Sequence, residues 1–291
     1  MLIQEKIKKT SFTSTEQIVV NYLETHLSQL KKITLREAAK ECFTYPSTFI
    51  RVAKKLDFKG WNELKEAYLK EIKYIDEGFH NINANHPFNS QDSLMTIARK
   101  MSRLTTETIE DTLSMIEQDI LEKVSHLIDQ SSEIKIFTHH HNGIVAQEFC
   151  LRMNRIGQYS SASVLAGDHF FDAAVIRENA CAMIISYSGE SETIEKLMKF
   201  LKKKQVPILL LTSIGDNSLS KLADYVLHIT TREKLYSKIG NFSAMSSINH
   251  LLNILYASVF SLHYEENYQH LVNISKYTDH RQASIGIIKE E

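Results

Sequence analysis

The sequence predicts an α/β protein, with an N-terminal all-α helix-turn-helix domain and a C-terminal α/β/α sandwich on a parallel five-stranded sheet. Residues 13–74 place apolar side chains at helical spacing throughout. From Glu133 onward, five short apolar runs alternate with helical patterns, as in a parallel sheet covered by helices. Residues 1–75 hold 14 Lys and Arg against 9 Asp and Glu, whereas the remainder holds 20 against 26. A basic first domain of this kind suits a polyanionic partner.

The composition excludes several classes of protein. At 291 residues, 43% hydrophobic and 24% charged, the chain is long enough for two globular domains. No apolar run reaches the roughly 18 residues of a membrane span, and the first residues lack the order of a secretory signal, so we expect a cytoplasmic protein. Cys42, Cys150 and Cys181 lie far apart in apolar surroundings, which predicts buried reduced thiols and neither a disulfide nor a metal site.

Four helices are expected in the first domain. Ser14 and Thr15 are candidate caps of the first, whose apolar side is Ile18, Val19, Tyr22, Leu23, Leu27 and Leu30. The second begins after Thr34, since Glu37 completes a capping box. A turn over residues 43–45 precedes a third helix, residues 46–56, in which Pro46 takes the first position and the inward side chains are Phe49, Ile50, Val52 and Ala53. A fourth helix covers residues 61–74.

A tight turn between the second and third helices predicts a helix-turn-helix, in which the start of the second of those helices faces base edges. Hydroxyl groups can donate to phosphates or bases, and an Arg can bridge guanine O6 and N7. The candidate DNA-binding residues are Tyr45, Ser47, Thr48, Arg51, Lys54 and Lys55, the two lysines lying near the backbone. The alternative is that these residues form the solvated side of a bundle helix.

Residues 76–90 have the composition of a linker. A long helical region follows over residues 91–130, with a break expected near residues 117–119. Its apolar stripe can either pair with a second copy of the chain or pack on its own domain. The stripe consists of Leu94, Ile97, Ala98, Met101, Leu104 and Ile109.

The sheet region predicts strands at residues 134–137, 162–165, 181–186, 207–212 and 225–229. Helices are expected at residues 143–156, 193–203, 218–223 and 241–263. Ligands of such sheets bind beyond the carboxyl ends of the strands.

A serine-rich loop at one such end is the most informative stretch of the chain. It follows the apolar run 181–185 and opens a helix, so its backbone N–H and hydroxyl groups can hold an anion such as phosphate. A serine-rich segment can also be an ordinary loop. The candidate ligand-binding residues here are Ser186, Ser188, Gly189, Glu190 and Ser191.

Several segments resemble a known family. Residues 34–39, 48–51, 54–56 and 58–65 are similar to the N-terminal domain of RpiR/MurR-type transcriptional regulators, and the later region resembles their sugar isomerase (SIS) domain. The resemblance covers nearly the whole chain. It implies a cytoplasmic homodimer or homotetramer that binds operator DNA and responds to a phosphorylated sugar, with no catalytic residue, metal or cofactor. The loop 186–191 matches the phosphate loop of that family, with Glu190 at its acidic position.

The chain departs from the family in three places. The family commonly has Ser at the position of Tyr45 and Gly at that of Asp57. After the first strand, Thr138 and His140 replace glycines and Asn142 replaces a serine that usually helps to bind the sugar phosphate. We include His140, His141 and Asn142 among the ligand-binding candidates. The His run can contact an acidic ligand, bind zinc or be an ordinary polar loop.

Three functions stay open at this point. The first is a transcriptional regulator of sugar or aminosugar metabolism controlled by a sugar phosphate. The second is a sugar-phosphate isomerase in which Glu190 or a histidine of residues 139–141 moves a proton. The third is a DNA binder that has lost the sugar phosphate. The expected domains are residues 1–77, a linker and connector over 78–130, the SIS domain over 131–264 and a tail over 265–291.

Overall fold

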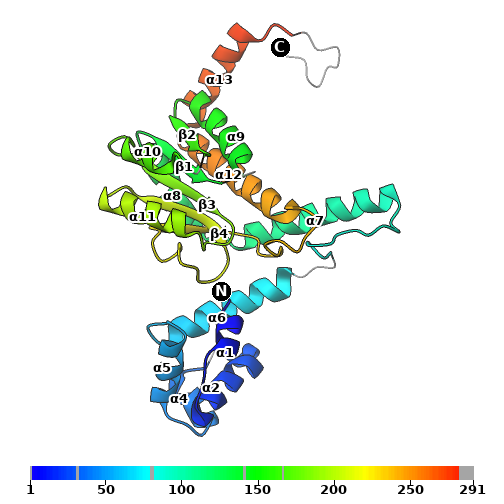
Figure 1. Cartoon of the computed structure of the whole chain (residues 1–291), viewed down its shortest axis with the longest axis vertical. Helices are drawn as coiled ribbons and strands as arrows, with labels where there is room; N and C mark the ends of the chain where they lie inside the picture. The colour runs from blue at the N-terminus through cyan, green and yellow to red at the C-terminus, as the bar shows by residue number, and fades with distance from the viewer. Residues whose placement is uncertain (1, 31–32, 79–81, 140–141, 166, 282–291) are drawn as a thin grey trace. The chain divides into compact units, whose positions relative to one another are not determined.

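The computed structural model describes residues 2–30, 33–78, 82–139, 142–165 and 167–281. The chain divides into two compact units: residues 1–115 with 212–221 and 228–247, and residues 116–211 with 222–227 and 248–291. The predicted fold class is confirmed, with a helical N-terminal domain and a five-stranded parallel sheet (Figure 1). The helical domain contains α1 (Ile3–Lys9), α2 (Ser14–Thr25), α3 (Leu27–Leu30), α4 (Leu35–Glu41), α5 (Pro46–Lys55) and α6 (Trp61–Gly78).

Side-chain caps fix two of these helix starts. The predicted capping box of α4 is confirmed, because the Thr34 hydroxyl accepts from the Glu37 N–H and the Glu37 carboxylate accepts from the Thr34 N–H at 2.9 Å. For α2 the predicted caps were wrong by one or two residues. Thr13 is the cap and forms the same reciprocal pair with Glu16, so Ser14 is already helical.

Aromatic side chains form the centre of the helical domain. Phe49 of α5 and Trp61 of α6 are buried and meet edge to face, with ring centroids 4.6 Å apart. This contact fixes α5 against α6. Two residues expected in the core lie at its margin instead, since Ile18 is 46% exposed and Ile50 is 38% exposed.

The sheet consists of β1 (Ile134–Thr138), β2 (Ser160–Ser163), β3 (Cys181–Ser186), β4 (Ile208–Ser213) and β5 (Tyr225–Ile229), in the order β2-β1-β3-β4-β5. Strand β2 begins two residues before its predicted start, because its small hydroxyl side chains carry little apolar signal. Strand β1 pairs with both β2 and β3 in parallel, so the loops after these three strands leave from the same edge.

Helices cover both faces of the sheet. The remaining helices are α7 (Leu94–Ser114), α8 (Gln118–Gln130), α9 (Asn142–Arg155), α10 (His169–Ala174), α11 (Glu192–Lys203), α12 (Phe242–Leu262) and α13 (Tyr264–Thr278). Helix α9 packs on β1 and β2, whereas α10 and α11 pack together on the other face (Figure 1). The connection from β1 through α9 to β2 and the connection from β2 through α10 to β3 run in opposite directions along the sheet, which places their helices on opposite faces when both are right-handed.

One expectation differs from the structure here, because residues 218–223 form turns and not a helix. Helix α10 was not among the expected elements, and α13 lies almost entirely within the segment expected as a C-terminal tail. The break between α7 and α8 is confirmed, at residues 115–117. No helix in the described part of the chain is long and apolar enough to cross a bilayer.

The apolar stripe of α7 divides into two halves. Leu94 is 85% exposed, whereas Leu104 is buried. Further along, two hydroxyl pairs join α7 to the start of α12: Thr108 to Ser243 at 2.8 Å and Thr112 to Ser247 at 2.7 Å. The second half of α7 therefore packs on its own domain, as one of the two expectations had it.

Candidate functional site

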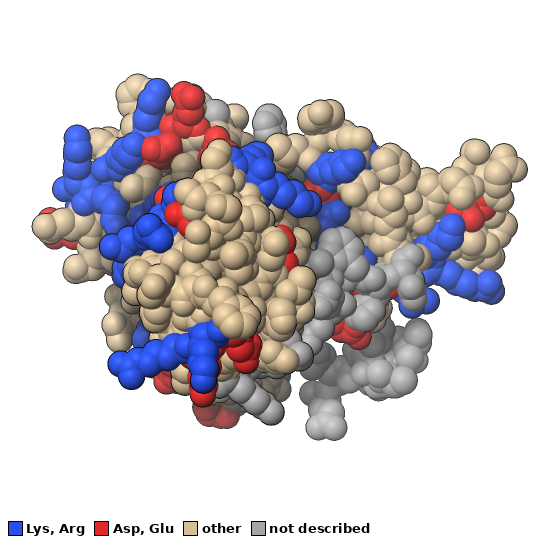
Figure 2. Space-filling model, turned by 90° about the horizontal axis from the view of Figure 1, so that it is seen from below, with Lys and Arg blue, Asp and Glu red and all other residues tan. Residues whose placement is uncertain are grey.

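The predicted DNA-binding face begins at the turn between α4 and α5. Hydrogen bonds fix this turn, since the Phe43 N–H donates to the Lys40 carbonyl at 3.1 Å and the Thr44 N–H to the Ala39 carbonyl at 2.9 Å. Tyr45 occupies the cap position of α5 without capping it through its side chain, and it is 77% exposed. Three further predicted residues, Ser47, Arg51 and Lys54, are also exposed. Seen from below in Figure 2, Lys and Arg side chains border a broad uncharged area.

Thr48, Arg51 and Lys55, three of the six predicted DNA-binding residues, have partners inside the domain. Thr48 is only 1% exposed, and its hydroxyl accepts from the Arg51 guanidinium at 3.3 Å. Thr48 therefore holds Arg51 and does not itself lie on the exposed face. The Lys55 ammonium lies 2.7 Å from the Glu16 carboxylate and donates to the Ser11 carbonyl at 3.2 Å. This pair holds the pKa of Glu16 down, at about 2, chiefly through the hydrogen bond from Lys55.

The serine loop lies where the sequence predicts it, between β3 and α11. Ser186 ends β3 and Ser191 is the cap of α11, accepting a hydrogen bond from the Ile194 N–H. Gly189 between them has a φ of 64°, in the left-handed region that a side chain disfavours. Ser188 is partly exposed and accepts from the Glu190 N–H at 3.4 Å. The loop thus presents small hydroxyls at the positive end of a 12-residue helix.

The loop after β1 lies beside the serine loop. Thr138 pairs in register with Ile185, and its hydroxyl donates to the Ile185 carbonyl at 3.0 Å. Asn142 is the first residue of α9 and is half-buried. Two other ligand-binding candidates, His140 and His141, lie outside the described residues.

A buried histidine, which was not among the predicted site residues, lies behind these loops. His169 at the start of α10 is fully buried, with its ring edge to face against Phe137 of β1 and 4.7 Å from the ring of His139. Burial lowers the pKa of His169, so its imidazole is neutral at pH 7. One sequence signal points to this site, the adjacent Asp168 and His169 shortly after the second strand. Across the described ranges, no group of three or more His, Cys, Asp or Glu is arranged to hold a metal ion.

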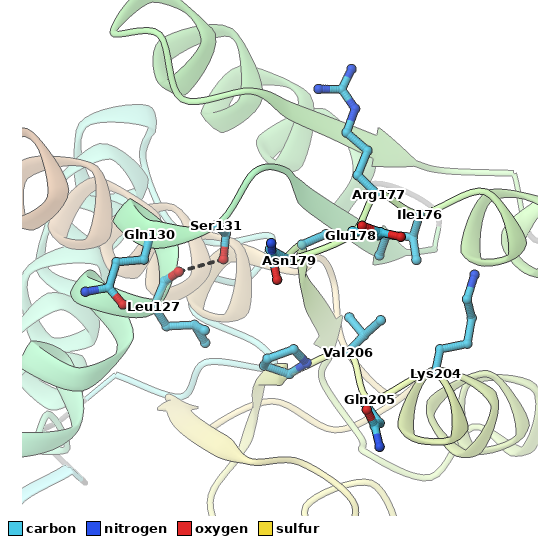
Figure 3. Close-up of a pocket in the computed structure, with 12 residues that line it drawn as sticks. Leu127, Gln130, Ser131, Ile176, Arg177, Glu178, Asn179, Lys204, Gln205 and Val206 are labelled. Carbon is cyan, nitrogen blue, oxygen red and sulfur yellow. Dashed lines mark hydrogen bonds between the residues drawn. The ribbon is translucent and has the colours of Figure 1, made fainter.

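A cavity of about 710 Å³ lies at the opposite edge of the sheet, where β3 and β4 begin (Figure 3). Its lining includes Ser131, Asn179 and Lys204. The Lys204 ammonium donates to the Ala174 carbonyl at 2.6 Å, so it caps the end of α10. Arg177 points away from the cavity in Figure 3, and its guanidinium stacks on Tyr159 at 3.9 Å. This cavity is separate from the serine loop and does not contribute to the candidate site.

A buried charge cluster links α7 to the segment after β5. The Arg232 guanidinium lies 2.8 Å from the Glu107 carboxylate and 3.6 Å from that of Asp111. All three side chains are at most 6% exposed. Glu233, the next residue, accepts hydrogen bonds from the N–H groups of Ser243 and Ala244 and so holds the start of α12. The cluster therefore fixes the helix that follows the linker to the carboxyl-end region of the last strand.

Comparisons with known proteins match this two-part architecture. The family model of the rpiR-type helix-turn-helix domain matches residues 1–73, and that of the SIS domain matches residues 127–258. Among solved structures, the Vibrio vulnificus NanR protein complexed with ManNAc-6P is 17% identical, with a TM-score of 0.58 over 91% of this chain and 93% of that one.

Two further structures match the second domain. The sugar isomerase domain of an RpiR transcription factor from Sphaerobacter thermophilus is 16% identical, with a TM-score of 0.54 over 62% of this chain and 98% of that one. A candidate phosphosugar isomerase involved in capsule formation in Bacteroides fragilis is 14% identical, with a TM-score of 0.52 over 61% and 97%. These likenesses concern the fold. The two family matches, in this order and over more than two thirds of the sequence, show that the chain belongs to the RpiR family of sugar-related transcriptional regulators.

Proposed function

We propose that the chain regulates transcription of genes for sugar or aminosugar metabolism, and that a phosphorylated sugar in the SIS domain controls its binding to operator DNA. The observation that carries this proposal is the combination, in one chain, of an exposed face on α5 with a serine loop at the start of α11. The proposal is supported by the structural similarity to NanR, whose structure contains ManNAc-6P, and to the Sphaerobacter RpiR domain. Under this proposal the protein acts in the cytoplasm as a homodimer or homotetramer.

The phosphate would lie against the serine loop. Hydroxyl groups of Ser186, Ser188 and Ser191 and the backbone at Gly189 supply neutral donors, and the start of α11 adds its positive helix end. Glu190 is exposed and suits sugar hydroxyls better than a dianion. Asn142 from the neighbouring loop completes the proposed contacts, together with His140 and His141.

Control of DNA binding requires that the effector favour one of two arrangements of the protein. The proposed path is α7, because this helix follows the linker and is tied to α12 by the pairs Thr108–Ser243 and Thr112–Ser247. A coupling of about 1–3 kcal/mol between the two sites would change operator affinity about 5- to 150-fold.

Substitution of Arg51 tests the DNA-binding half of the proposal. We expect Arg51→Ala to lower affinity for the operator duplex by about 5- to 150-fold, since a bidentate Arg contact is worth about 1–3 kcal/mol. The measurement is fluorescence anisotropy with labelled duplex, with far-UV circular dichroism to verify the fold. Lys9→Ala, which removes one exposed positive charge from α1 of the same domain, is the control and should bind nearly as the parent does. Parental affinity in Arg51→Ala would show that α5 is not the recognition helix.

Thermal unfolding against a panel of hexose and aminosugar phosphates tests the effector half. A ligand at 100 times its Kd stabilises the protein by about 2.7 kcal/mol. Ser188→Ala should reduce the shift, because it removes one proposed phosphate donor. If no member of the panel shifts the midpoint, the SIS domain does not bind sugar phosphates and the chain is a DNA binder without that control.

A sugar-phosphate isomerase is the second candidate, since the Glu190 carboxylate is exposed in the serine loop, where it could move a proton of a bound sugar. The same panel separates the two functions when turnover is followed by NMR. If the parent converts a sugar phosphate and Glu190→Gln does not, the result would favour the enzyme over the regulator.

A further inference from the structure

Phe43 is unusual in both its backbone and its side chain. It is the residue after the C-cap of α4, with a φ of 49°, in the left-handed region. The two hydrogen bonds of the turn, from Phe43 to Lys40 and from Thr44 to Ala39, form the motif that ends many helices. That position usually holds Gly, because a side chain there is strained. The turn needs only the backbone of residue 43.

The Phe43 side chain gains nothing from the fold to offset this strain. It is 98% exposed, whereas Phe49 of α5 is fully buried against Trp61. A fully exposed Phe forgoes the burial that makes the residue favourable in a protein. Contact with an outside partner would offset both the strain and the lost burial, and this is the explanation that we pursue for a phenylalanine here.

The position of Phe43 indicates the partner. Two residues further along, Tyr45 is 77% exposed at the start of α5, and the exposed Ser47 and Arg51 follow on that helix. Two aromatic side chains thus lie at the N-terminal end of α5, the helix that is proposed to enter the major groove. The benzyl group of Phe43 has no hydrogen-bond donor or acceptor, so it cannot read the polar edges of bases. The apolar group that the major groove offers is the C5 methyl of thymine.

We propose that Phe43 reads a thymine methyl in the operator half-site and is a specificity-determining residue of this protein. The inference rests on the proposed DNA-binding function. The strain at residue 43 is then the cost of holding an apolar side chain beside the groove. An apolar wedge between base steps is a different use of such a residue and belongs to proteins that bend DNA from the minor groove.

Replacement of thymine by uracil tests this directly, because uracil lacks only the methyl. The full chain first selects its duplex from a random pool, and each thymidine of that duplex is then replaced in turn by deoxyuridine. We expect the parent to lose affinity about fourfold at one or two positions, the factor for one buried methyl-sized group. Phe43→Gly should lose about the same factor on the thymine duplex and be indifferent to uracil at those positions.

Stability measurements separate a lost contact from a damaged domain. Phe43→Gly relieves the left-handed strain, so the unfolding midpoint of the helical domain should not fall. Gln205→Gly is the matched control: it removes a neutral side chain at a φ of 59° outside the helical domain and should leave DNA binding unchanged.

The possible outcomes are distinct. Equal sensitivity of parent and Phe43→Gly to uracil at every position, or parental affinity of Phe43→Gly for the thymine duplex, overturns the inference while the proposed DNA binding stands. If the parent enriches no duplex from the pool, the proposed function fails and the inference fails with it.

Discussion

Glu16→Gln is expected to destabilise the helical domain by about 1–2 kcal/mol at pH 7. The Glu16 side chain is buried, and its carboxylate lies 2.7 Å from the Lys55 ammonium. The drop of its pKa from 4.5 to about 2 corresponds to about 3 kcal/mol at 1.36 kcal/mol per unit. That figure is an upper bound, because Lys55 is 39% exposed and solvent screens the pair. Glutamine keeps the capping box with Thr13, so the substitution removes the charge alone.

The effect should depend on pH in a defined direction. The folded-state pKa of Glu16 is lower than the unfolded-state value, so its stabilisation is complete above about pH 4.5 and is lost as the pH falls toward 2. The difference between parent and Glu16→Gln should therefore shrink below pH 4.5. Urea unfolding followed by tryptophan fluorescence measures it, because Trp61 is the single tryptophan and lies in the core of this domain.

Glu37→Gln is the control for this experiment. Glu37 occupies the same capping-box position in α4 but is exposed and has Thr34 as its partner. Equal urea midpoints for the parent and Glu16→Gln would refute the assigned role of the Glu16–Lys55 pair. The same variant has a functional consequence, since it releases the Lys55 ammonium and removes a negative charge near α5. Its affinity for DNA should rise, with a steeper dependence on salt.

Three other perturbations should report on the larger part of the protein. Arg232→Ala removes the buried cation of the Glu107 carboxylate, which keeps the more exposed Arg103 at 3.0 Å, and should cost about 3 kcal/mol, measured by thermal unfolding; a loss below 1 kcal/mol would contradict it. Gly143→Ala places a Cβ 2.8 Å from Val164 and should cost about 1–3 kcal/mol, so an unchanged midpoint would exclude the clash. The pKa of His169 is lowered in the folded state, so the unfolded chain binds more protons and stability should fall as the pH drops below about 6.5. His169→Phe should show a weaker dependence of the unfolding free energy on pH between pH 7 and 5. Equal slopes for the parent and His169→Phe would show that another group causes the dependence.

Features that depend on a short stretch of residues could be predicted from the sequence. Strand β3 was predicted with the bounds that the structure shows, Cys181–Ser186, because a run of apolar residues ends at a serine and a helix follows. The capping box of α4 was predicted in the same way, since Thr34 and Glu37 have the required types and spacing. In both cases the physical cause is local, so a single stretch of sequence contains it.

Elements that depend on distant partners could not be predicted in this way. Helix α1 has only seven residues, and its first N–H groups are held by the Glu71 carboxylate from α6. Burial raises the pKa of Glu71, although these two hydrogen bonds oppose the rise. A helix this short is marginal alone, so its existence follows from a carboxylate 68 residues away. Conversely, the helical spacing over residues 218–223 predicted a helix that does not form, because the segment forms turns in which Asn217 and Ser220 hydrogen-bond to each other.

The same limit applies to the DNA-binding residues. Helical periodicity places Lys55 on the polar side of α5, and that is correct as a statement about one helix, whereas Thr48 lies on the buried side with Phe49 and Val52. Across the domain, however, α2 brings Glu16 to Lys55, and the first turn of α5 turns the Thr48 hydroxyl toward Arg51. The predicted DNA-binding residues therefore divide into those that hold α5 in place and those that are exposed and available for the proposed contact with DNA. Tyr45, Ser47 and Arg51 belong to the second group. The exposed Phe43 lies beside them and joins this group, although a search for polar residues could not have found it because its side chain is apolar.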